Sequence, residues 1–141
     1  MVDQFQAVVR GGGPSTAVDP DPVDPAVLRS WASSGVEELI STSRLLRQQL
    51  GVHEDVCRKV IAGLDQGAPM AYLLDDVEAA SWRGVVTEAV KGFEVARHRV
   101  RLILVAIAVD EGMSITDVAK RWGVSRQLAS RWVQESADLA G

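Results

Sequence analysis

Residues 114–133 read SITDVAKRWGVSRQLASRWV, and the spacing of serine, glycine and apolar residues in this segment predicts the structure of the carboxy-terminal part of the chain. Ser114 precedes Asp117 by three residues, which is the spacing of a capping box at a helix start. Gly123 stands where a tight turn needs a positive φ angle, and Ser125 can cap a second helix. The pattern therefore predicts two short helices, over residues 114–122 and 126–137, joined by a glycine turn.

Two helices that cross this closely must bury one side of each, so small and apolar residues are expected between them. The residues assigned to this interior are Ile115, Val118, Ala119, Val124, Ala129, Trp132 and Val133. Trp122 and Trp132 are interpreted as core residues rather than as platforms for stacking bases. The arrangement is that of a helix-turn-helix.

Polar and basic side chains remain for the outer side of this helix pair. Arginine pairs with the O6 and N7 atoms of guanine and glutamine with N6 and N7 of adenine, whereas hydroxyl groups, lysines and helix amino termini contact phosphates. The residues expected to bind DNA are Thr116, Lys120, Arg121, Ser125, Arg126, Gln127, Ser130 and Arg131. For Arg97, Arg99 and Arg101 two interpretations stay open, namely a contribution to the positive field or a solvated surface.

The stretch SITDVAKRWGVSRQLASRW resembles the helix-turn-helix of bacterial transposases, resolvase-type recombinases and small transcription regulators. Its GVSR core at residues 123–126 carries most of the resemblance, which covers about residues 114–133. Trp122 departs from the leucine or phenylalanine that is commoner there. Leu128 and Ala129 replace a polar and a β-branched residue, which bears on the face that the second helix presents. The resemblance implies a DNA-binding protein.

Charge is divided unevenly along this chain of 141 residues, whose formal net charge is −4. Residues 1–96 hold 14 acidic and 8 basic residues, whereas residues 97–141 hold 5 acidic and 7 basic ones. An acidic amino-terminal part opposes indiscriminate attachment to nucleic acid and leaves the basic carboxy-terminal part as the expected contact.

The whole chain is expected to be all-α, with a helical amino-terminal region joined by a long helix to the helix-turn-helix. Residues 1–24 contain GGG and DPDPVDP and are predicted to be a disordered tail, and Asp24-Pro25 predicts a helix start. Residues 25–84 form a helical region with a possible role in dimerisation or sensing, and residues 85–141 form the DNA-binding region. Helices are expected over 25–50, 54–65, from 70 and over about 85–110, with Gly51 and Gly112 as terminators.

A heptad-like pattern runs along the predicted long helix. Its members are Val86, Ala89, Phe93, Ala96, Val100, Ile103 and Ile107. Two interpretations stay open: this seam packs on earlier helices of the same chain, or it joins two copies as a homodimer. Trp31, Tyr72 and Trp82 are interpreted as core residues, although a ligand cavity among them is an alternative.

Little in the sequence indicates chemistry other than binding. Cys57 is the single cysteine, which excludes an internal disulfide, and we interpret it as a small apolar helix residue rather than as a thiol activated by His53. No Cys/His cluster has the spacing of a metal site. The longest apolar run, residues 102–109, is too short to cross a bilayer, and no secretory signal opens the chain. We expect a cytoplasmic, nucleoid-associated bacterial protein without catalytic residues, metal or cofactor.

Three functions compete at this point. The first is a dimeric, sequence-specific regulator of transcription that reads double-stranded DNA through its last helix. The second is a DNA-binding accessory of a recombination or plasmid-maintenance system, with catalysis supplied by another protein. The third is a protein-docking scaffold that uses residues 25–84 to bind a partner.

Overall fold

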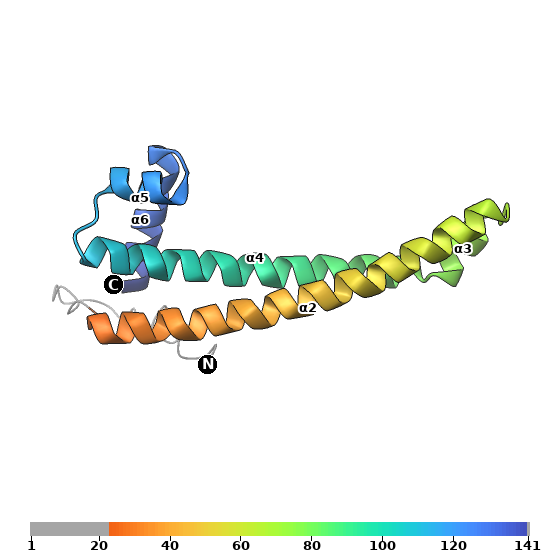
Figure 1. The fold of residues 1–141 in the computed structure, drawn as a ribbon, viewed down its shortest axis with the longest axis horizontal. Coiled ribbons are helices and arrows are strands. Elements are labelled where there is room, and N and C mark those ends of the chain that lie inside the picture. The colour runs from red at the N-terminus through yellow and green to blue at the C-terminus, as the bar shows by residue number, and fades with distance from the viewer. Residues whose placement is uncertain (1–22, 141) are drawn as a thin grey trace, which may run out of the picture. The chain divides into compact units, whose positions relative to one another are not determined.

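A computed structural model describes residues 23–140, and all regular structure in that range is helical (Figure 1). The helices are α2 (Pro25–Asp65), α3 (Met70–Asp76), α4 (Ala79–Asp110), α5 (Ile115–Trp122) and α6 (Arg126–Ala140). The all-α prediction is confirmed. The predicted tail lies outside the described residues except for its last two positions. Within the described range, no helix combines the length and the apolar character that crossing a membrane requires.

The chain divides into two compact units, and α2 and α4 each contribute to both. We call residues 38–97 the hairpin unit, and residues 23–37 together with 98–140 the helix-turn-helix unit. The boundary expected between residues 84 and 85 falls inside α4. Separate roles for the two sides of that boundary remain a proposal.

Helix α2 begins as the sequence predicts but ends later. The backbone N–H of Ala26 donates to Asp24 Oδ1 at 2.8 Å, so the aspartate caps a helix whose first residue is Pro25. The prediction that Gly51 ends this helix is wrong, because residues 25–50 and 54–65 belong to one continuous helix. A glycine weakens a helix interior by only about 1 kcal/mol, which packing on both sides of it can outweigh.

The packed side of α2 explains this continuity. In the hairpin unit its half-buried positions recur at alternating intervals of three and four residues, and the pattern keeps its phase through Gly51. These positions are Leu39, Thr42, Leu46, Gln49, His53, Val56, Val60 and Gly63. Such spacing is that of a coiled-coil seam, so the helix keeps one side against its neighbour over the whole unit.

Helix α3 and a tight turn connect α2 to α4. Gly63 of α2 gives room to Leu73 of α3, whose Cδ2 atom would clash with a Cβ atom added at that glycine. Val77 follows α3, and Glu78 then adopts a positive φ angle of 51°. The carbonyl of Glu78 accepts from Trp82 N–H at 3.1 Å, so α4 begins at Ala79 rather than near Val85 as expected.

The seam predicted on α4 lies on the packed side of that helix. Ala96, Val100 and Ile103 are buried, and its other four members are half-buried. A Cβ atom added at Gly35 of α2 would lie 3.3 Å from Val100 Cγ2 and 3.7 Å from Ile103 Cδ1. These two residues therefore pack within their own chain, while a homodimer through the seam remains a prediction.

The helix-turn-helix unit has a core built from three helices. Its buried members come from α4, α5 and α6 and are Leu102, Val105, Val118, Ala119, Ala129 and Trp132. Leu28 and Ala32 of α2 are also buried in this unit, and Arg29 forms an exposed ion pair with Glu111. Tyr72, in the hairpin unit, is 62% exposed, so its assignment to the core is wrong.

Candidate nucleic-acid interface

Local hydrogen bonds build the turn between α5 and α6. Ser114 Oγ accepts from the N–H of Asp117 at 3.2 Å and donates to Asp117 Oδ2 at 3.0 Å. Gly123 has a φ angle of 67°, and the N–H of Val124 donates to the carbonyl of Ala119 at 3.0 Å. The predicted capping of α5 and the positive φ angle at the turn are therefore confirmed.

The amino terminus of α6 is capped by a serine. Ser125 Oγ accepts from the N–H of Leu128 at 3.1 Å, and the helix begins at Arg126 as predicted. It continues to Ala140, three residues beyond the expected end. Leu128 is half-buried against the core, yet Gln127 keeps an exposed side chain. The unusual Leu128 therefore does not turn Gln127 into the interior.

On the side of α6 away from Gln127, Trp132 and a network of polar side chains connect the helix to α4. Trp132 is buried, and the guanidinium carbon of Arg101 lies 4.5 Å from its ring centroid. Arg101 Nη1 lies 3.3 Å from His98 Nδ1, and His98 Nε2 lies 2.8 Å from Glu135 Oε2. Because arginine can only donate, Nδ1 accepts and Nε2 donates to the carboxylate. Arg101 is therefore not a solvated surface residue, because it packs against α6, and its contribution to the positive field remains a prediction.

Trp122 behaves differently from its neighbour, and the prediction that it is a core residue is wrong. It is 41% exposed, with its ring centroid 5.9 Å from that of Trp132 and the two ring planes at 78°. This edge-to-face contact uses one side of the indole ring and leaves the other in solvent. Trp122 is the last residue of α5, where the helix end cannot cover it.

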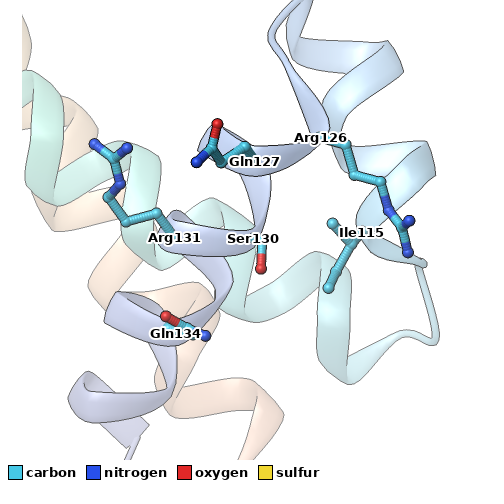
Figure 2. A pocket seen from close by; sticks show the side chains of 6 residues that line it. All are labelled: Ile115, Arg126, Gln127, Ser130, Arg131 and Gln134. Carbon is cyan, nitrogen blue, oxygen red and sulfur yellow. The ribbon is translucent and has the colours of Figure 1, made fainter.

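A shallow hollow of about 470 Å³ lies along the first turns of α6 (Figure 2). It is lined by Ile115, Arg126, Gln127, Ser130, Arg131 and Gln134. Gln127 and Arg131 extend from one side of α6, whereas Arg126 lies on the side of Ile115 from α5 (Figure 2). No carboxylate lines the hollow, and within residues 23–140 neither arginine forms an ion pair. The surface therefore presents two uncompensated positive charges beside amide and hydroxyl groups.

The structure brings together four of the eight residues predicted to bind DNA. Arg126, Gln127, Ser130 and Arg131 line the hollow, and their spacing along α6 spreads them over less than half of the helix circumference. The other four are exposed on α5 or at the turn and lie outside its lining: Thr116, Lys120, Arg121 and Ser125. DNA contact by any of the eight remains a proposal.

Two lining residues did not appear among the predicted contacts. Gln134 follows Ser130 by one helical turn, so continuing the same side of α6 would have found it. Ile115 was assigned to the core because it is apolar. It does pack against the core, but it is half-buried and also forms part of the wall of the hollow. Among the described residues, no group of three or more His, Cys, Asp or Glu side chains could hold a metal ion.

A comparison with known protein families matches the part of the chain that contains the helix-turn-helix. Residues 95–141, about a third of the sequence, match the family model of a homeodomain-like domain. No curated protein and no solved structure matches the chain. Homeodomain-like domains are helix-turn-helix folds that bind DNA. The carboxy-terminal segment thus carries a domain of the DNA-binding helix-turn-helix type.

Proposed function

We propose that this protein binds double-stranded DNA in a sequence-specific manner and acts as a bacterial regulator of transcription. The observation that carries the proposal is the exposed side of α6, where Arg126 and Arg131 flank Gln127 and Ser130 without any compensating carboxylate. The opposite side of the same helix is anchored through Trp132. A helix with one side packed against the core and a polar, exposed opposite side is suited to insertion into a major groove.

Each part of this surface has a distinct role in the proposal. Arg126 and Arg131 hydrogen-bond guanine, and Gln127 hydrogen-bonds adenine. Lys120, Arg121 and Thr116 on α5 contact phosphates, as do Ser125 and the amino terminus of α6. One such helix reads only a few base pairs. Binding as a dimer, with half-sites one helical turn or about 34–36 Å apart, supplies the remaining affinity and specificity.

The test is selection of binding sites from random genomic fragments at several salt concentrations, with Arg126→Ala alongside the unaltered protein. The variant should lose about 1–3 kcal/mol at the preferred sites and discriminate less among bases at the position that Arg126 reads. Arg58→Ala is the matched control, because Arg58 is an exposed arginine of the hairpin unit paired with Glu54 and Asp55. Unchanged site preference in Arg126→Ala would contradict readout by α6.

A further inference from the structure

The hairpin unit buries very little of its apolar surface. Of residues 38–97, the buried side chains are those of Leu73, Val77 and Ala96. A self-sufficient domain of this length hides about 60% of the surface that its unfolded chain exposes. Large apolar residues remain exposed instead on all three helical segments, among them Ile40, Leu45, Leu50, Val52, Ile61, Leu64, Met70, Tyr72, Leu74, Val85 and Val90. A contiguous apolar surface marks an interaction site, so the part of these helices where apolar side chains gather is the candidate.

A groove of about 590 Å³ runs through this apolar surface between α2, α3 and α4. Its walls include Val56 and Ile61 of α2, Leu74 of α3 and Trp82 of α4. His53 also lines it, and within residues 23–140 its Nδ1 atom is the one buried side-chain polar atom that lacks a hydrogen-bond partner. Buried polar atoms in folded proteins are almost always satisfied. The chain by itself therefore leaves this groove incomplete.

Charges at the two ends of the hairpin unit are of opposite sign. Near one end Arg44 and Arg47 set the sign, because Lys91 and Glu88 there cancel each other. At the α3 end Asp65, Asp75, Asp76 and Glu78 outnumber Lys59 and Arg83. None of these residues forms an ion pair among the described residues. Along α2, Arg47 and Asp65 are about 27 Å apart at 1.5 Å per residue. The two charged ends therefore cannot neutralise each other within one copy.

We propose that the groove of the hairpin unit is covered by the hairpin unit of a second copy, packed antiparallel as a four-helix arrangement. A two-fold axis near Cys57, which is exposed and lines the groove, places Arg44 and Arg47 of each copy beside the α3 end of the other. Parallel packing would instead bring like charges together. Leu50 and Leu64 are exposed on α2 seven residues before and after Cys57, so helical spacing continues the apolar side past the groove and past the reach of a small ligand.

The proposal differs from a dimer through the predicted seam of α4, because it uses the open side of the hairpin unit. It also stands apart from DNA binding, because none of its residues belongs to the hollow on α6. Arg126→Ala should leave the association of two copies unchanged. Failure of the DNA proposal and failure of this one are therefore distinguishable.

Sedimentation equilibrium of the full chain, whose mass is 15.2 kDa, tests the association. We expect a species of twice that mass, and we expect Ile61→Asp to sediment as a monomer. Ile61 is 58% exposed, so the change should leave the helical circular-dichroism signal intact. Val95→Asp is the matched control, since Val95 is exposed on α4 outside the groove, and it should stay dimeric.

Charge reversal tests the antiparallel orientation. The double variant Arg44→Glu/Arg47→Glu should dissociate more readily, and adding Asp75→Arg/Asp76→Arg should restore the dimer. A two-fold axis near Cys57 brings the Cys57 residues of the two copies together. Mild oxidation should therefore join them, since a disulfide forms only where the Cα atoms lie within about 7 Å.

Several results would overturn the proposal. The first is that the protein remains monomeric at all concentrations. Binding of an apolar dye in the groove of that monomer would show that the groove accepts a small ligand instead. Another is a dimer that withstands Ile61→Asp. A charge-reversed variant that the second pair of substitutions fails to restore, or a dimer without a Cys57 cross-link, would contradict the antiparallel axis.

Discussion

Gly123 and Gly51 occupy opposite backbone environments, and the same substitution should therefore have opposite effects at the two positions. Gly123 has a φ angle of 67°, where a side chain costs about 1–2 kcal/mol. Gly51 lies inside α2 with nothing within 4 Å of an added Cβ atom, where alanine gains about 0.5–1 kcal/mol. Urea unfolding should show Gly123→Ala destabilised and Gly51→Ala stabilised. Equal shifts of the same sign would contradict this backbone account.

Individual residues also mark where sequence reasoning succeeds. Ser114, Gly123 and Ser125 act on groups within a few residues of themselves, so their roles follow from spacing alone. Arg101 was left open because the ring that it packs against, that of Trp132, lies more than thirty residues away, on α6. Trp122 was misassigned because apolar character does not reveal that a helix end leaves one side of the indole ring in solvent.

At the scale of an element, the cap of α6 combines structural support with a proposed phosphate contact. Ser125→Ala removes the acceptor for Leu128 N–H and should cost about 1 kcal/mol of stability. Ser125→Asp keeps an acceptor and should retain that stability, while its negative charge should repel a phosphate and weaken DNA binding. Thermal unfolding and DNA titration of both variants measure the two effects. Undiminished DNA affinity in Ser125→Asp would show that no phosphate approaches the cap.

The lengths of the two long helices were harder to predict than the short ones. Gly51 looked like a terminator because glycine is a poor helix former, but the seam from Leu39 to Gly63 continues through it without a change of phase. Glu78 adopts a positive φ angle that sequence does not favour for glutamate, so the start of α4 was placed too late. Long-range packing decides both boundaries, whereas local caps decide those of α5 and the start of α6.

At the scale of the whole molecule, an acidic protein that binds DNA through a small basic surface should show a salt dependence set by few contacts. Each phosphate contact adds about 0.9 to the slope of the logarithm of affinity against that of salt concentration. If two copies bind together, Lys120→Ala removes two contacts and should lower the slope by about 2. Lys59→Ala, an equal charge change in the hairpin unit, should leave the slope unaltered.

The monomeric variant Ile61→Asp separates the contribution of the second copy from the phosphate contact made by Lys120. In Ile61→Asp, Lys120→Ala should lower the slope by about 1, because only one copy then meets each site. A slope that Lys120→Ala does not change in either background would remove Lys120 from the phosphate contacts. Fluorescence anisotropy of a labelled duplex gives the slope in each case.

The exposed edge of Trp122 gives this protein an intrinsic optical reporter next to its basic surface. Trp31, Trp82 and Trp132 are half-buried or buried, so a soluble quencher reaches the Trp122 indole most easily. Lys120 and Arg121 concentrate an anionic quencher such as iodide near Trp122. Iodide should therefore quench Trp122 fluorescence more strongly than neutral acrylamide does. A polyanion bound to the neighbouring surface would exclude iodide, so the fluorescence of Trp122 would recover without any attached dye.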